Sequence, residues 1–186
     1  MPDDERDLAS LRAQSRSYPP LDLAEVDRLL PRAAVSGPNQ ERLVQDQLSV
    51  AFDEAMARRD RGVGVADLYQ EATVAAIVAV AQYSSRGGAA GGLRRYVARV
   101  VGSHLDDMIE QARLERDADL AFARDAETYE TAEVSLRHEL GRSATSTEIA
   151  ALLEWPEERV AVVAEAVTAA RELWDADIVE YLDDED

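Results

Sequence analysis

Apolar residues recur every three or four positions along most of the chain, which is the spacing of amphipathic helices. The clearest stripe lies between about Gln40 and Arg61 and consists of Leu43, Val44, Leu48, Ala51, Phe52, Ala55 and Met56. The same periodicity predicts further helices over residues 21–30, 67–83, 93–115, 119–140, 145–154 and 157–172. No alternating strand pattern extends beyond a few residues. We therefore predict an all-α fold, with a helical bundle followed by a small helix-turn-helix-type domain of three helices.

Three segments depart from this amphipathic pattern. Residues 74–81 are apolar on nearly every side, so the helix that contains them should lie at the centre of the bundle. Residues 87–92 consist of glycine and alanine only, which predicts a flexible loop. The first 20 residues are polar and end in Tyr-Pro-Pro, which predicts a mobile arm.

Turn and capping signals divide the second half of the chain. Gly141 stands at the position that a helix C-terminal cap prefers. Thr145 and Glu148 have the S/T-x-x-E spacing of a capping box, and Pro156 can open the helix that follows. We predict four parts: a mobile arm over 1–20, a helical domain over 21–116, a helix-turn-helix domain over 117–171 and an acidic tail over 172–186.

Charge is distributed unevenly along the chain. The 186 residues include 38 acidic and 20 basic side chains, and the formal net charge is -18. Residues 117–186 carry -15 of this charge, whereas residues 40–116 carry only -1 and include a cluster of arginines. The total charge therefore does not exclude contact with nucleic acid in the middle of the chain. The acidic C-terminal part is a candidate surface for a basic partner.

Templates for catalysis and metal binding are not found in the sequence. Cysteine is absent, which excludes disulfides, thiolate nucleophiles and Cys-ligated metals, and no lysine is present for a Walker motif. The two histidines, His104 and His138, are far apart. We predict no metal, no cofactor and no enzymatic activity. The start of the chain lacks the layout of a signal peptide, and the longest apolar run, over residues 74–81, has 8 residues. A bilayer span needs about 18, so we predict a cytoplasmic protein without membrane contact.

The segment Asp67-Leu68-Tyr69-Gln70-Glu71-Ala72-Thr73 resembles the Asp-Leu-Ile-Gln-Glu signature of bacterial RNA polymerase sigma factors of the sigma-70 family. Its neighbours follow in the family's order. Residues 43–52 are similar to the helix before the signature, 58–62 to its basic turn, 111–113 to a tripeptide after the promoter-reading helix, and 139–150 to the start of the third domain. The resemblance covers about residues 20–170, and no segment resembles the fourth domain, which reads the minus-thirty-five element.

In this family the signature helix docks on a coiled coil of the largest subunit of core RNA polymerase. The resemblance therefore implies a core-polymerase-binding site made of Asp67, Leu68, Gln70, Glu71, Thr73 and Ile77. One helical face would present two carboxylates and an amide to a basic partner helix, while Leu68 and Ile77 pack against it. A solvated helix start is the alternative, since acidic residues favour the first turn of any helix.

The predicted helix over 93–115 departs from the family's promoter-melting helix. That helix normally carries two adjacent tryptophans, whose positions fall here on Arg99 and Val100. The position of a glutamine that reads the minus-ten element falls on Ser103, and a basic position falls on Asp107. Base stacking contributes about 1–3 kcal/mol per base, and an acid is unfavourable beside phosphates, so we expect promoter opening by this helix to be impaired.

A weak nucleic-acid contact is a separate expectation. Its candidate residues are Arg94, Arg95, Tyr96 and Arg99, which could hold a nucleic-acid backbone. The arginines could equally serve only to keep an exposed helix soluble. The second helix of the helix-turn-helix opens with Glu157-Glu158-Arg159, which is unfavourable for reading DNA.

Besides autonomous binding of duplex DNA through the helix-turn-helix, these patterns lead to two hypotheses. The first is a sigma-like protein that binds core RNA polymerase in transcription initiation, either as a short divergent sigma factor or as a regulator that occupies the sigma site. Promoter DNA is then a weakened partner, and an anti-sigma protein or another basic protein is a further candidate. The second is a stand-alone interaction module with a sigma-like fold, whose acidic tail binds a basic partner without promoter recognition.

Overall fold

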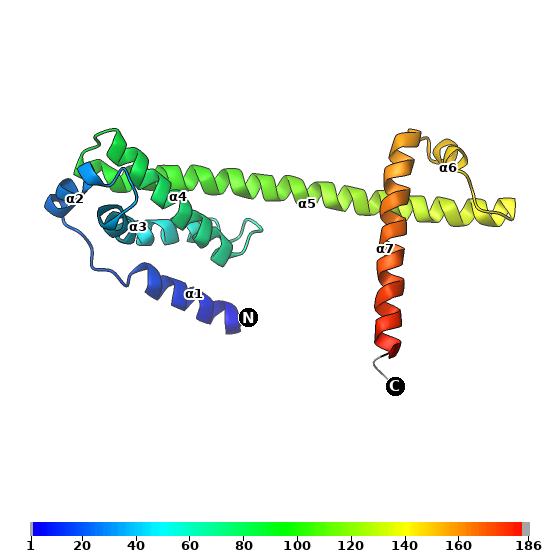
Figure 1. Ribbon diagram of the computed structural model, residues 1–186, viewed down its shortest axis with the longest axis horizontal. Helices are drawn as coiled ribbons and strands as arrows, with labels where there is room; N and C mark the ends of the chain where they lie inside the picture. The colour runs from blue at the N-terminus through cyan, green and yellow to red at the C-terminus, as the bar shows by residue number, and fades with distance from the viewer. Residues whose placement is uncertain (1, 184–186) are drawn as a thin grey trace. The chain divides into compact units, whose positions relative to one another are not determined.

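The computed structural model describes the backbone of residues 2–183 and the side chains of residues 8–174. Its elements are α1 (Pro2–Ser15), α2 (Leu23–Leu29), η1 (Leu30–Arg32), α3 (Pro38–Met56), α4 (Val65–Ser85), η2 (Ala90–Gly92), α5 (Leu93–Leu140), α6 (Ser146–Leu153) and α7 (Glu157–Asp183) (Figure 1). Across residues 2–183 these helices occur without any strand, so the predicted all-α class is confirmed. The chain divides into a first unit, Met1–Leu114, and a second unit, Glu115–Asp186.

Helix α5 is one helix of 48 residues that contributes to both units. We expected two helices, over 93–115 and 119–140, and that expectation is wrong. The junction reads Arg116-Asp117-Ala118 and contains neither glycine nor proline, so nothing in it interrupts helical hydrogen bonding. The acidic composition begins at this junction, but a change in charge does not break a helix.

The core of the first unit is built on the packing of α3 against α4, with α2 and η1 beside them (Figure 1). The rings of Phe52 on α3 and Tyr69 on α4 meet edge to face, with their centroids 5.8 Å apart. Helix α5 adds a buried residue at every fourth position, namely Leu93, Val97, Val101, Leu105 and Ile109. The small aromatic content therefore suffices, because aliphatic side chains and alanines fill most of this core.

Helix α1 replaces the mobile arm that we expected over residues 1–20. It contacts α3 and α4, Leu11 packs against the core of the first unit, and Ser15 is buried. Leu8, Leu11 and Ser15 are three and four residues apart, so they share one helical face. The prediction failed because the polar composition of the whole segment conceals this short stripe.

The glycine-rich loop packs around Tyr83, a contact that the sequence did not predict. The Tyr83 hydroxyl donates a hydrogen bond to the carbonyl oxygen of Ala89 at 2.8 Å. A Cβ atom added at Gly88 or Gly92 would overlap the Tyr83 side chain. The glycines therefore allow the backbone to pass directly over a tyrosine ring, a use of glycine that does not require mobility.

The second unit consists of the C-terminal part of α5 with α6 and α7. Its core contains Tyr129, Ala132, Ile149, Ala150, Val160, Val163 and Val167. The capping box is present: the Glu148 amide donates to Thr145 Oγ1 at 3.3 Å, and the Thr145 amide donates to Glu148 Oε2 at 2.8 Å. Gly141 has a φ of +66°, as a C-terminal cap requires.

Helix α7 extends beyond the end that we predicted near residue 172. Its backbone is helical to Asp183, so most of the segment expected as an acidic tail over 172–186 is helix, and residues 184–186 lie outside the described residues. No glycine or proline occurs after Pro156, and alanine, leucine and glutamate favour helix. The acidic composition of the segment had suggested a tail, although it is compatible with a helix.

Candidate functional site

One face of α4 presents polar and then apolar side chains to solvent on successive turns. Asp67 and Gln70 are exposed and Glu71 is half-exposed, close to the start of the helix. Val74, Ile77 and Val78 follow, with 54%, 41% and 46% of their surface exposed. Each of the six residues lies three or four positions from at least one other, so they form one stripe, called the α4 face below. Exposed valine and isoleucine side chains in a contiguous stripe are typical of an interaction surface.

The predicted polymerase-binding residues divide between this face and the core. Asp67, Gln70, Glu71 and Ile77 lie on the α4 face, and half-buried Thr73 donates from Oγ1 to the Tyr69 carbonyl oxygen at 2.8 Å. Leu68 is fully buried in the core of the first unit. The expectation that Leu68 packs against a partner is therefore wrong, because its side chain lies on the side of α4 that faces the rest of the unit.

The expectation that residues 74–81 are surrounded by the bundle is also wrong. Val74, Ile77 and Val78 are exposed, whereas Ala75, Ala76, Ala79 and Val80 form the buried side. The sequence contains a signal that could have found Val74 and Val78. They continue the three-to-four spacing that begins at Asp67 and Glu71, and the buried side is made mainly of alanine.

His104 of α5 contacts the α4 face. Its Nε2 atom lies 3.0 Å from Glu71 Oε2, and both side chains are nearly half exposed. Sequence reasoning missed this contact, because the two residues are 33 positions apart and neither belongs to a recognisable pair. The contact holds the Glu71 carboxylate and occupies one of the oxygens that a basic partner would use.

Arg58 of the predicted basic turn connects α3 to α5. It donates to Glu54 Oε2 at 2.7 Å and to both carboxylate oxygens of Asp106 at 3.0 and 2.9 Å, and Arg61 also donates to Asp106. The Arg58 hydrogen bonds lower the pKa of Asp106 from its ordinary value, and Arg61 contributes. A Cβ at Gly102 would lie 3.0 Å from Arg58 Nη2, so glycine there lets the guanidinium approach α5.

The candidate nucleic-acid residues separate into two groups. Tyr96 and Arg99 lie together: the Arg99 guanidinium is 5.3 Å from the centre of the Tyr96 ring. Tyr83 packs against the same ring at 5.0 Å, and Arg86 donates to the Tyr96 hydroxyl at 3.2 Å. The sequence had indicated Arg86 only as one of several clustered arginines.

Arg94 and Arg95 form the second group. They line a shallow depression that also includes Asp53 and Glu54 of α3. The carboxylates beside them offset their positive charge, which weakens them as phosphate ligands.

The positions that depart from the promoter-melting pattern form one surface on α5. Arg99, Val100, Ser103, His104 and Asp107 line a single shallow depression. The lining includes no tryptophan, tyrosine or phenylalanine ring, although such rings are the usual platforms for stacked bases.

Arg159 opens the second helix of the helix-turn-helix, after two glutamates, and makes its contacts within the protein. Arg159 donates from Nε to Asp125 at 2.9 Å, and its guanidinium lies 4.2 Å from the centre of the Trp155 ring. Glu157 and Glu158, which precede it, are exposed. This end of α7 therefore presents carboxylates, which repel DNA phosphates.

Residues 126–180 match the family model for sigma-70 region 3. The match supports a sigma-70-like protein. It covers the C-terminal part of α5, all of α6 and most of α7, which is less than a third of the total length, and it indicates a sigma-factor-like role in transcription. Region 3 is a non-enzymatic transcription-factor domain. No curated protein matches the chain.

Within the described residues no group of three or more His, Asp or Glu side chains is arranged to hold a metal ion. None of the helices in that part of the chain has the length and apolar character needed to cross a membrane.

Proposed function

We propose that this sigma-70-like protein binds core RNA polymerase through the α4 face and acts in transcription initiation in the cytoplasm. It would be either a short divergent sigma factor or a regulator that occupies the sigma site. The observation that carries the proposal is the composition of the exposed stripe, with carboxylates and an amide in the first turns and Val74, Ile77 and Val78 in the next turns.

The α4 face suits a basic, amphipathic helical partner, such as the coiled coil of the largest polymerase subunit on which members of the sigma-70 family dock. Asp67 and Glu71 can accept charge-assisted hydrogen bonds from arginine or lysine. Burial of an aliphatic side chain contributes about 1.5–3 kcal/mol relative to exposure, so Val74, Ile77 and Val78 can supply most of the affinity. The carboxylates would then determine the orientation of the partner and speed the association.

The side chains of α5 favour the second of these two forms, a regulator that occupies the sigma site. The depression lined by Arg99, Val100, Ser103, His104 and Asp107 contains no Trp, Tyr or Phe ring, whereas stacking on such rings is worth about 1–3 kcal/mol per base. A protein that docks on polymerase but separates DNA strands poorly would compete with sigma factors for the same site. The Tyr96 and Arg99 pair leaves a weak contact with a nucleic-acid backbone as part of the proposal.

A binding experiment with purified core polymerase tests the proposal. The wild type should form a complex at micromolar concentration on gel filtration, and the double variant Asp67→Arg, Glu71→Arg should bind at least about tenfold more weakly. The matched control is Glu127→Arg, Glu165→Arg, which makes the same charge change at two exposed carboxylates of the second unit. Absence of a complex, or equal loss in the control, would contradict docking through the α4 face.

The second candidate function is a stand-alone interaction module that binds a basic protein. The charge of -15 over residues 117–186 favours it. A pull-down from extract of the native cell separates the two candidates. Polymerase subunits should accompany the protein if the first is correct, whereas capture of a basic protein without polymerase would support the module.

A further inference from the structure

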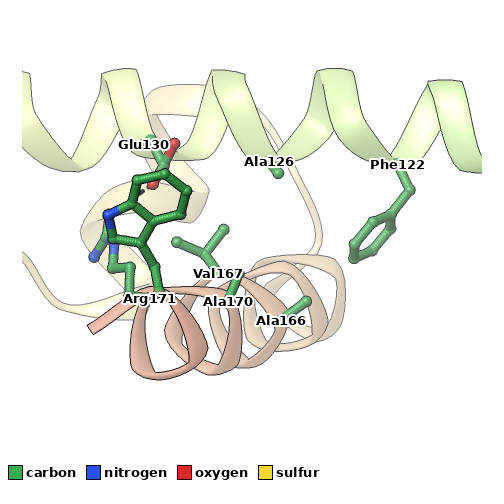
Figure 2. A pocket seen from close by; sticks show the side chains of 8 residues that line it. Phe122, Ala126, Glu130, Ala166, Val167, Ala170 and Arg171 are labelled. Carbon is green, nitrogen blue, oxygen red and sulfur yellow. Dashed lines mark hydrogen bonds and ion pairs between the residues drawn. The ribbon is translucent and has the colours of Figure 1, made fainter. Parts of the chain in front are cut away.

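An apolar groove lies between α5 and α7 within the second unit. It has a volume of about 520 Å³ and takes its floor from Ala126 on α5 and from Val167 and Ala170 on α7 (Figure 2). Phe122 and Trp174 also line it, and they are 39% and 69% exposed. Two large aromatic side chains left in water beside a floor of small residues are unusual on a protein surface without a partner. The alanines keep the floor low, so a bulky side chain from outside can enter.

An ion-pair cluster lies at one end of this groove. Arg171 donates to Glu130 Oε1 and to Glu133 Oε2, both at 3.0 Å. Figure 2 shows Arg171 and Glu130 together at the end of the groove that is away from Phe122. Arg137 also donates to Glu133, at 2.9 Å, so the cluster contains two arginines and two glutamates and is neutral as a whole.

The surroundings of the groove are strongly acidic. Exposed Glu127, Glu165 and Glu172 are adjacent in the sequence to lining residues, and residues 117–186 carry -15 in total. This charge decides the class of occupant. Nucleic acid and anionic lipid would be repelled, and so would a second copy of the same unit, whereas a cationic partner would be attracted.

We propose that this groove binds an amphipathic, basic helix of another protein. Large apolar or aromatic side chains on one face of that helix enter the groove between Phe122 and Trp174, and its flanking lysines and arginines meet the surrounding carboxylates. This is the helix-in-groove mode of recognition, in which aromatic residues supply most of the affinity and charges supply specificity. The groove uses no residue of the α4 face, so the second partner does not depend on the proposed polymerase docking.

A labelled synthetic helix of about 18 residues serves as the probe, with leucine and tryptophan on one face and lysine and arginine on the other. Its binding to the full chain is measured by fluorescence anisotropy. Two further peptides provide comparisons: one has glutamine in place of the apolar face, and the other has glutamate in place of the basic residues. We expect micromolar binding of the first peptide only, and weaker binding as salt increases.

Variants of the chain locate the binding. Phe122→Ala and Trp174→Ala should each weaken binding of the peptide to the chain at least about tenfold. Val162→Ala is the matched control, because Val162 is 59% exposed on α7 and does not line the groove. Its affinity should equal that of the wild type. All these side chains are exposed enough for the fold to survive, which circular dichroism checks.

Several results would overturn the proposal. They are equal binding by the groove variants and the wild type, equal binding of the peptide without an apolar face, and no binding of the basic peptide at low salt. Displacement of the peptide by duplex DNA would show that the partner class is wrong.

Discussion

Replacing Asp106 by asparagine should destabilise the first unit, because Asp106 connects two of its helices. The carboxylate accepts two hydrogen bonds, at 3.0 and 2.9 Å, from Arg58, which follows α3 and is itself bonded to Glu54 of that helix, and a further one from Arg61. Asparagine has almost the same shape but no charge, and its amide nitrogen cannot accept a hydrogen bond. The variant therefore removes the paired hydrogen bonds between Arg58 and residue 106, while the shape of the protein surface remains almost unchanged.

The size of the effect follows from burial. A hydrogen bond to a charged group is worth about 1.5–3 kcal/mol when it is shielded from water. Arg58 is 14% exposed but Asp106 is 46% exposed, so solvent reduces the gain, and Arg58 keeps its bond to Glu54. We expect a loss of about 1–1.5 kcal/mol in unfolding free energy. For a unit of this size that corresponds to a fall of about 4–6 °C in Tm.

The loss should depend on pH in a defined direction. The folded-state pKa of Asp106 lies below its ordinary value of 3.8, chiefly because of the Arg58 hydrogen bond. The stabilisation is therefore fully present above the unfolded-state pKa and is lost as pH falls through the lower folded-state pKa. The difference between wild type and Asp106→Asn should be constant near neutral pH and should shrink as pH falls below 3.8.

Thermal unfolding followed by circular dichroism at a series of pH values measures this difference. Asp107→Asn is the matched control, since it removes the same charge from the next residue, which is exposed. An unchanged Tm for Asp106→Asn at neutral pH would refute the reasoning. Equal losses in the two variants would also refute it, because the effect would then arise from net charge alone.

Three further substitutions test other contacts. Gly88→Ala should lower stability by about 1–3 kcal/mol in thermal unfolding, because its Cβ would overlap the Tyr83 ring. His104→Ala should leave Tm almost unchanged and raise affinity for core polymerase severalfold in a binding titration, because it frees the Glu71 carboxylate. Glu148→Gln should lower the Tm of the second unit at neutral pH. The pKa of Glu148 is lowered to about 2, chiefly by the hydrogen bond from Arg142. The difference in Tm between wild type and variant should therefore disappear as pH falls from 4.5 towards 2.

Local signals in the sequence predicted local structure well. The capping box of Thr145 and Glu148 and the cap at Gly141 depend only on neighbouring residues, and the structure contains both. The helical class follows in the same way from the spacing of apolar residues. The errors occur where the sequence changed in composition without a helix breaker, as at the junction within α5, or where a short stripe lay in a polar segment, as at Leu11 of α1.

The site was predicted less well, because its residues depend on the packing of distant segments. A match to a motif assigned Leu68 to the surface by its position in the signature, but burial is decided by the helices around α4. The contact of His104 with Glu71 and that of Arg58 with Asp106 join residues 33 and 48 positions apart. Neither pair has a local signature, so no reading of one sequence could have found them.

The Arg58 contacts change how the acidic residues of α5 should be interpreted. Asp106 and Asp107 are adjacent in the sequence, and we expected Asp107 to be unfavourable beside the phosphates of a nucleic acid. Asp106 is neutralised by Arg58 and Arg61, whereas Asp107 lies in the same depression as Arg99 and Ser103. The electrostatic obstacle at this surface is therefore a single carboxylate. Asp107→Arg should then strengthen binding of single-stranded DNA more than Asp106→Arg, which would also break the tie to α3. A titration in which the two variants gain equally would contradict this assignment.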